Sequence, residues 1–387
     1  MKFNKIKIVL LLVLPLLGCN VISELKLQSN SDSFVSKKTS IPFSYNKKLI
    51  VVNAYLNNSK NTNSFIFDTG AFQSKVEYHL SEELNLKTIS KRNNGTAQGI
   101  KREIEITSID TIRLSESRFF NIGAGKLKYD TNSYSPCIAK DGIIGANLIK
   151  LTNWKIDYDK KEMEVSRTPF SINTNEEHYN LKFITSFLSG VPKVNVVLDG
   201  KVIENVIFDL GFNGGLVVPY KFANQFHSDN TKTIIDQSTA GIFGSNRDTL
   251  LVKELNVKLG NFQTKIPVEF SSLNKALLGN DFLEHFTIYL DYKNNKITLV
   301  PISNVEVDKV KPFIPGVLND SLWIVNRTKA GIPLKIGDTL RTINGHKPQD
   351  LFQSHCDYFL KISEFLKSDT LHIETTNGIK TNLRLNH

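Results

Sequence analysis

Short apolar or alternating runs recur along most of the chain and predict β-strands. The segments that separate them are rich in Asn, Gly and Lys, residues that are common in turns. One longer helical pattern spans 352–366 near the C-terminus. We therefore expect a mainly β protein with few helices. The clearest strand patterns are Leu49 to Val52, Phe65 to Phe67, Ile104 to Ile106, Val194 to Val196 and Ile297 to Leu299.

The middle of the chain contains an internal repeat. Residues 142–165 and 276–299 align at one offset of 134, which pairs Gly145 with Gly279. Each copy ends in a predicted strand, a turn and a second strand. A duplicated β-unit favours two similar lobes related by a pseudo-twofold axis, and a cleft at that axis is the natural place for a site.

Each copy also carries an Asp-x-Gly triplet directly after an apolar strand. The triplets are Asp68-Thr69-Gly70 and Asp209-Leu210-Gly211. Gly145 and Gly279 follow these aspartates by 77 and 70 residues, and two apolar residues precede each of them. A single triplet is compatible with a turn, in which the Asp side chain bonds its own backbone. Its recurrence at the equivalent place in both copies argues for a paired site.

This combined pattern resembles that of the retropepsin and pepsin-like aspartic proteases, over residues 43–301. The resemblance implies a bilobal acid-protease fold in which Asp68 and Asp209 face each other as the catalytic pair. In such a pair, two carboxyls about 3 Å apart share one proton and hold the water that attacks the peptide bond. The resemblance also implies that Gly145 and Gly279 lie behind the two catalytic loops and that the other triplet residues support the loops.

Two features of the triplets depart from the pattern of that family. Leu210 stands where the family has a hydroxyl that bonds to the opposite loop, so only Thr69 can make this bond. Losing a buried partner costs about 1–3 kcal/mol, unless Leu210 packs in compensation. Ala71 and Phe212 follow the glycines, where pepsin-like enzymes often have a hydroxyl. We therefore expect raised pKa values for the dyad and activity at mildly acidic to neutral pH.

The expected flap is the hairpin at 95–106, whose glycines suit a mobile lid. It lacks a clear flap tyrosine, and a comparable Gly-rich segment lies at 240–245 in the second copy. Other chemistries have little support. The sequence contains no His-Glu-x-x-His, no Cys and His cluster with zinc spacing, no Gly-x-Ser-x-Gly and no P-loop. We therefore expect neither a metal nor a cofactor.

The first residues resemble the leader of a bacterial lipoprotein. A cationic start and an apolar run from Ile8 to Leu17 precede Gly18 and Cys19, in the order of a lipobox. This resemblance implies a signal peptide at 1–18, a lipid on Cys19 and attachment to a membrane of the bacterial envelope. A plain secretory signal that contains a cysteine is the alternative. Residues 19–42, rich in Ser, Asn and Lys, predict a flexible tether.

Cysteine use and charge add two expectations. Nothing in the sequence brings Cys137 and Cys356 within bridging range, so we expect two small buried residues rather than a disulfide. The net charge is +10, with Lys and Arg scattered rather than clustered. This distribution favours a solvated surface; attraction to an anionic membrane or to acidic peptides is the alternative. No basic stripe with interleaved aromatics is present, so nucleic acid is not an expected partner.

The C-terminal part predicts a third, small α/β unit at 314–387. An Ala-Gly pair followed by Gly-Asp and Asn-Gly resembles the pattern of bacterial PDZ domains. The resemblance implies that an extended peptide pairs with a strand at Leu322 to Val325. The alternative is a domain that only packs on the rest of the chain. The motif residues are Gly331, Gly337, Asp338, Asn344 and Gly345.

These observations favour an aspartic endopeptidase that is anchored to the bacterial envelope and acts on a peptide or protein substrate. The main alternative, which Leu210 favours, is a protease-like lipoprotein that binds peptides or proteins but has lost catalysis. A purely structural lipoprotein would leave both triplets unexplained. The expected units are a signal peptide at 1–18, a tether at 19–42, lobes at 43–168 and 182–301, and a PDZ-like domain at 314–387.

Overall fold

The computed structural model describes residues 26–35, 38–96, 99–131, 133–173, 175–186, 188–238, 240–319, 321–368 and 370–385. Strands account for 49% of the structure and helices for 12%, so the protein is mainly β, as the patterns predict. The leader and Cys19 lie outside the described residues. None of the helices in the described part is long and apolar enough to cross a membrane.

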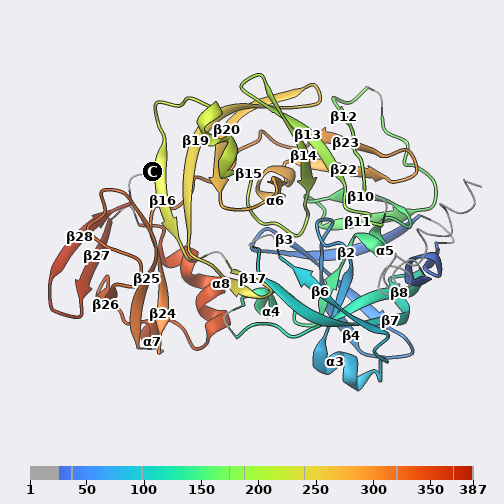
Figure 1. Cartoon of the computed structure of the whole chain (residues 1–387), viewed down its shortest axis with the longest axis horizontal. Coiled ribbons are helices and arrows are strands. Elements are labelled where there is room, and N and C mark those ends of the chain that lie inside the picture. The colour runs from blue at the N-terminus through green and yellow to red at the C-terminus, as the bar shows by residue number, and fades with distance from the viewer. Residues whose placement is uncertain are drawn as a thin grey trace, which may run out of the picture.

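The first half of the chain forms a β-rich lobe, coloured blue to green in Figure 1. The three runs that predict strands in this half all lie within strands of the structure. The strands are β1 (Asp32–Phe34), β2 (Thr39–Asn46), β3 (Leu49–Leu56), β4 (Thr62–Phe67), β5 (Ser74–Glu77), β6 (Ser90–Gly95), β7 (Lys101–Leu114), β8 (Ser117–Leu127), β9 (Gly142–Ile144), β10 (Asn153–Asp157) and β11 (Glu162–Ser166). The helices are α3 (Tyr78–Glu83), α4 (Ser135–Ile138) and α5 (Ala146–Ile149).

The second lobe repeats this plan, in green, yellow and orange in Figure 1. The two runs that predict strands here lie in β13 and β23. The strands are β12 (Tyr179–Lys182), β13 (Lys193–Leu198), β14 (Lys201–Phe208), β15 (Leu216–Pro219), β16 (Lys232–Asp236), β17 (Ala240–Gly241), β18 (Gly244–Ser245), β19 (Asp248–Leu259), β20 (Phe262–Ser271), β21 (Leu277–Leu278), β22 (Phe286–Asp291) and β23 (Lys296–Pro301). The helices are the 3-10 helix η2 (Tyr220–Gln225) and α6 (Asn280–Leu283).

The two lobes share one sheet. Its path runs β12-β23-β22-β10-β11-β2 and then continues into the first lobe. At the junction, β10 and β22 pair antiparallel, with Lys155 opposite Tyr289. These two residues are 134 apart in the sequence, which is the offset of the repeat (289 − 155). A local twofold axis therefore passes between equivalent strands of the two copies.

One buried apolar cluster runs through both lobes. It includes Phe67 and Trp154 from the first lobe, and Phe208 and Phe282 from the second. Phe67 and Phe208 directly precede the two Asp-x-Gly triplets, so the packing of this core fixes where each of these strands ends. Leu210, in the second triplet, belongs to the same cluster.

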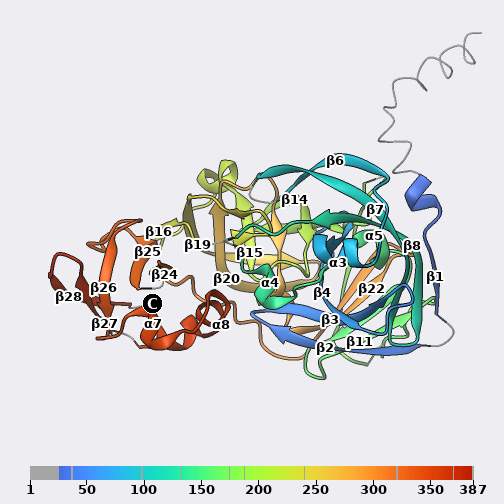
Figure 2. The ribbon, with the colours of Figure 1, turned by 90° about the horizontal axis from the view of Figure 1, so that it is seen from below.

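A third unit lies at one end of the molecule, coloured orange to red in Figure 2. It has its own buried cluster around Trp323 and Ile343. The predicted helix at 352–366 is present as α8, which begins at His355. The elements are β24 (Ile314–Leu318), β25 (Leu322–Lys329), β26 (Thr339–Ile343), α7 (Pro348–Leu351), α8 (His355–Phe365), β27 (Thr370–Thr375) and β28 (Lys380–Arg384).

Strand pairing and a disulfide attach this unit to both lobes. β25 continues the sheet of the second lobe by pairing with β16, and Arg327 bonds to Asp236 across that pair at 2.8 Å. A disulfide joins Cys137 in α4 to Cys356 in α8. The prediction that these cysteines are unpaired is therefore wrong. They are 219 residues apart, and only the packing of α8 on the first lobe brings their Cα atoms to 5.2 Å.

The strand that was expected to pair with a peptide has no free edge at its centre. Leu322 to Val325 belongs to β25, which pairs with β24 and β26 and, at its end, with β16. That prediction is therefore wrong. The motif residues instead lie in the turns before and after β26, and four of the five, all except Asp338, have positive φ. The carboxylate of Asp338 accepts from the N–H of Lys335 at 2.7 Å within the first turn.

The segment predicted as a flexible tether is partly built into the first lobe. β1 pairs with β8, and β2 begins at Thr39 rather than after residue 42. The prediction of a tether is wrong for these residues. Ser33 and Val35 point inward and are buried, while Phe34 between them is exposed. The tether was predicted from the Ser- and Asn-rich composition of the segment, and β1 is too short for its alternation to outweigh that composition.

Candidate active site

The two Asp-x-Gly triplets occupy equivalent places in the two lobes. Asp68 follows β4, and its backbone N–H donates to the carbonyl of Ile144 in β9 at 2.9 Å. Asp209 follows β14, and its N–H donates to the carbonyl of Leu278 in β21 at 2.9 Å. β4 pairs parallel with β9, and β14 pairs parallel with β21. The same hydrogen bond therefore holds each aspartate at the end of its strand.

The triplets meet where the two lobes face each other. The carboxyls of Asp68 and Asp209 lie close enough for each to act on the pKa of the other. A Cβ atom added to Gly70 would lie 2.3 Å from Oδ2 of Asp209, and one added to Gly211 would lie 2.1 Å from Cγ of Asp68. Each glycine thus lies directly against the aspartate of the opposite loop, where a side chain does not fit.

Thr69 is the hydrogen-bonding link between the loops. Its Oγ1 donates to the carbonyl of Phe208 at 2.6 Å and accepts from the N–H of Leu210 at 2.9 Å. Thr69 is fully buried, so both backbone groups depend on it for a partner. Leu210 cannot make the reciprocal bond, and its side chain is packed in the shared core with no exposed surface. Packing therefore takes the place of the second hydroxyl.

Burial shifts the pKa values of both aspartates upward, and the charge of Asp68 adds to the shift of Asp209. Each residue keeps part of its surface exposed, but protein atoms crowd its carboxyl. Burial raises the pKa of Asp209 well above its ordinary value, and the charge of Asp68 raises it further. Burial also raises the pKa of Asp68, although Lys75 and the N–H of Ala71 partly offset this effect. The nearby ammonium of Lys75 therefore favours the charged form of Asp68.

A side-chain network supports the first loop from behind. Oγ of Ser74 accepts from the N–H of Gly145 at 3.0 Å and donates to Oδ1 of Asn147 at 2.9 Å. Nδ2 of Asn147 donates to the carbonyl of Gly123 in β8 at 2.8 Å. A Cβ added to Gly145 would lie 2.6 Å from the backbone of Gln73, so only glycine allows this close approach. Gly145 therefore packs directly behind the first loop, as the resemblance implies.

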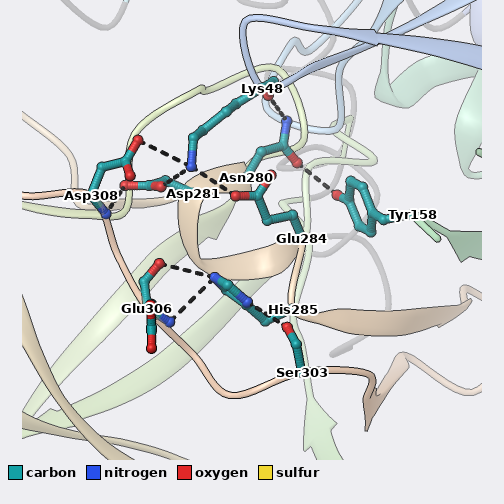
Figure 3. Close-up of polar contacts among 9 residues, drawn as sticks. All are labelled: Lys48, Tyr158, Asn280, Asp281, Glu284, His285, Ser303, Glu306 and Asp308. Carbon is teal, nitrogen blue, oxygen red and sulfur yellow. Dashed lines mark hydrogen bonds and ion pairs between the residues drawn. The ribbon is translucent and has the colours of Figure 1, made fainter. Parts of the chain in front are cut away.

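Asn280 supports the second loop, and Figure 3 shows its contacts with Lys48 and Tyr158 of the first lobe. Its Nδ2 donates to the carbonyls of Leu210 and Lys48, at 2.8 and 2.7 Å. Its Oδ1 accepts from the hydroxyl of Tyr158, in the first lobe, at 2.7 Å. The preceding Gly279 packs against the backbone that follows the second triplet, 2.5 Å from where its Cβ would lie. One buried amide thus links the second loop to the first lobe.

Lys48 anchors the first lobe to α6 beside this network (Figure 3). From the turn between β2 and β3, its ammonium bonds to Asp281, to Glu284 at 2.7 Å and to Asp308 at 3.3 Å. Burial would lower the pKa of Lys48, but the hydrogen bonds to Asp281 and Glu284 raise it above its ordinary value. Lys48 therefore stays charged and fixes the position of α6, which carries Asn280.

Two Gly-rich hairpins meet beside the site. The predicted flap is a hairpin of β6 and β7. From the second lobe, the β17–β18 hairpin reaches the first lobe, where the carbonyl of Phe243 accepts from Arg102 at 3.3 Å. The carbonyl of Ile242 accepts from the N–H of Asp130 at 3.2 Å. Ile242 also packs against the same apolar cluster as Ala71, the residue after the first triplet.

Comparisons with known proteins do not assign this chain to a family. No protein-family model matches it, and a search of curated proteins finds no match. Within the described residues, no group of three or more His, Cys, Asp or Glu side chains is placed to hold a metal ion. The chemistry of the site is therefore interpreted from its own geometry.

Sequence reasoning identified the residues that meet but missed those that support them. The triplets and both repeat glycines lie where the duplication predicts. Ser74, Asn147 and Asn280 were not singled out, although they hold the loops. The available signal was position, since Asn147 and Asn280 follow the repeat glycines by two residues and one residue.

Replacing Thr69 tests the link between the loops. Thr69→Val removes the hydroxyl but keeps the shape, and it leaves the carbonyl of Phe208 and the N–H of Leu210 without their partner. We expect the free energy of unfolding to fall by about 1–3 kcal/mol or more, measured by urea denaturation. Thr69→Ser keeps the hydroxyl and is the matched control. Equal stability of the two variants would contradict this role of Thr69.

The raised pKa values predict a specific pH dependence of stability. An Asp whose pKa is higher in the folded state stabilises the fold fully below its unfolded pKa of about 3.9, and this stability is lost as pH rises through the folded pKa. Asn mimics the protonated carboxyl, so Asp209→Asn should become more stable than the wild type as pH rises from about 4 to 7. Urea denaturation across this range is the measurement.

The exposed Asp110 on β7 provides the control for that comparison. Asp110→Asn should follow the pH dependence of the wild type, because this side chain is not part of the buried pair. A stability difference between Asp209→Asn and the wild type that does not change with pH would show that Asp209 titrates as an ordinary surface carboxyl.

Proposed function

We propose that this protein is an aspartic endopeptidase of the pepsin and retropepsin type. The observation that carries the proposal is the meeting of Asp68 and Asp209, from equivalent loops across a local twofold axis, with the glycine of each loop packed against the aspartate of the other. Like charges at such close range cannot both ionise, so the pair shares a proton. The shared sheet, the duplicated loop supports and the two Gly-rich hairpins are consistent with this proposal.

In the proposed reaction one aspartate is ionised and the other is protonated. We assign the ionised role to Asp68, because the charge of Lys75 favours its carboxylate; Asp68 takes a proton from a water while the oxygen of that water attacks the carbonyl carbon. Asp209 donates its proton to the carbonyl oxygen, which gives a tetrahedral diol. When the diol collapses, Asp68 passes its proton to the nitrogen, the C–N bond breaks, and Asp209 recovers a proton from a hydroxyl.

We also propose that the protein works in the bacterial envelope, attached through a lipid on Cys19. Disulfides persist mainly in oxidising compartments outside the cytoplasm, and the bond between Cys137 and Cys356 supports such a location. The motif around Cys19 provides the anchor in this proposal.

We propose that the third unit borders the substrate cleft, although its strand β25 has no free edge for a peptide to pair with. Phe359 of α8 packs against the same apolar cluster as Ala71 and Ile242. The disulfide at Cys356 holds α8 in this position. A polypeptide guided by this unit would therefore approach the cleft next to the first triplet.

A second candidate function is peptide binding without turnover. The absence of a hydroxyl at Leu210 favours it, because the loops are linked from one side only. In this case the cleft would hold an extended polypeptide, and the dyad would contribute hydrogen bonds rather than catalysis. Turnover separates the two candidates.

Peptide cleavage by the leaderless protein tests the endopeptidase proposal. A diverse peptide library is incubated at pH 3–8 with and without pepstatin, and the products are identified by mass spectrometry. We expect cleavage, and we expect Asp68→Asn and Asp209→Asn each to lower turnover by about 100-fold or more. Asp110→Asn should retain turnover. A folded wild type that cleaves no peptide overturns the proposal, and peptide affinity that survives both dyad substitutions then supports the binding function.

A further inference from the structure

A buried lysine beside the first aspartate is poorly satisfied. Lys75 on β5 is only 7% exposed. Burial lowers the pKa of Lys75, and the nearby charge of Asp68 acts in the opposite direction. The ammonium donates one hydrogen bond, 3.4 Å long, to the carbonyl of Gln73. An ammonium carries three donors, so most of the hydrogen-bonding capacity of Lys75 is unused.

The other two buried lysines of the described residues are better satisfied. Lys126 bonds to Glu82 at 2.9 Å, and Lys253 donates to two backbone carbonyls at 2.9 and 2.7 Å. Burying an ammonium without such partners costs several kcal/mol. A Leu or Met would fill the same space as the stem of Lys75 without this cost. Packing alone therefore does not explain a lysine at this position.

Gln73 adds a second unfilled donor next to Lys75. Its Oε1 accepts from the guanidinium of Arg92 in β6 at 2.5 Å. Because a guanidinium has only donors, this contact fixes the orientation of the amide and directs Nε2 away from Arg92. Nε2 is buried and has no hydrogen-bond partner among the described residues. A buried donor without a partner costs about 1–3 kcal/mol, so this place favours an added acceptor.

The backbone places these donors on one face of β8. Gly123 and Gly125 are two residues apart on that strand and therefore face the same side. A Cβ on Gly123 would lie 2.9 Å from Nε2 of Gln73, and one on Gly125 would lie 3.9 Å from Cγ of Lys75. Gln73 thus packs against Gly123, while Gly125 lies against the side chain of Ile104, 2.5 Å from where its Cβ would lie, and the stem of Lys75 passes beside it. Arg92 reaches them from the flap, and its charge also acts on Lys75.

We propose that Gln73, Lys75 and Arg92 form a subsite that binds a carboxylate of the substrate next to Asp68. This inference rests on the proposed protease function and adds the class of substrate. Two cations and a buried amide N–H supply the charge and the hydrogen bonds that a carboxylate accepts. The carboxylate comes from an Asp or Glu side chain close to the scissile bond, or from the free C-terminus of the peptide.

Matched peptide pairs test this subsite and separate the two sources. At each position around the cleaved bond, one peptide carries Glu and its partner carries Gln, and each is made with a free and an amidated C-terminus. We expect the best carboxylate peptide to be cleaved about tenfold faster or more, in kcat/KM, than its neutral partner. A preference for Glu identifies a side chain, and a preference for the free terminus identifies the chain end.

Substitution of the cations assigns the preference to these residues. Lys75→Met keeps the apolar stem, and it should reduce the ratio of kcat/KM between the carboxylate peptide and its neutral partner to about twofold or less, whatever its effect on the rate of both. Arg92→Met should weaken the same preference and provides a second route if Lys75→Met does not fold. Lys91→Met, at the neighbouring exposed position of β6, is the matched control and should keep the preference.

Several results would overturn the subsite. Equal cleavage of every pair by the wild type rejects it and leaves the protease proposal standing. The subsite is also rejected if Lys75→Met slows cleavage of the carboxylate and the neutral peptide equally and shifts the pH profile. Lys75 then acts only on the pKa of Asp68, and the protease proposal stands. If the wild type cleaves nothing, calorimetric binding of the same pairs decides. Tighter binding of the carboxylate peptides that Lys75→Met abolishes supports the subsite, although the protease proposal has then failed. Equal binding of the carboxylate and neutral peptides overturns the subsite.

Discussion

Two carboxyls held close together resist being ionised at the same time, and the two lobes are organised around bringing Asp68 and Asp209 together. The pairing of β10 with β22 sets the twofold axis, and Thr69 joins the loops across it. Glycine is required on both loops, because any side chain would displace the opposite aspartate. With Leu210 in place of a second hydroxyl, the contact depends on core packing as much as on hydrogen bonds.

Much of this arrangement is readable from the sequence, because its signals are local or repeated. Alternation predicts the strands, and the single offset of 134 predicts equivalent loops that meet at an axis. The glycines of both Gly-rich hairpins mark the segments that meet beside the site. For Leu210 the sequence left open whether packing compensates for the missing hydroxyl, and the structure shows its side chain fully buried.

The rest depends on contacts between distant residues, for which the sequence has no local signal. The cysteines of the disulfide are 219 residues apart, and only the docking of α8 on the first lobe brings them together. Asn280 is recognisable as a support only when Tyr158 and Lys48 are seen to approach it from the other lobe. The sequence around Lys75 predicts an ordinary strand. What is unusual is that its ammonium is buried and has only one long hydrogen bond, which the sequence does not indicate.

A nuclear magnetic resonance titration of the two aspartate carboxyls tests the shared proton most directly. The protein is labelled with ¹³C at Asp Cγ, and the two signals are assigned with single Asp→Asn variants. The account predicts that one carboxyl keeps its proton well above the usual Asp range of about 3.9, and that the titration of each changes when the other is replaced. Two independent titrations near that value, unaffected by either substitution, would contradict the shared proton and the catalytic pair built on it.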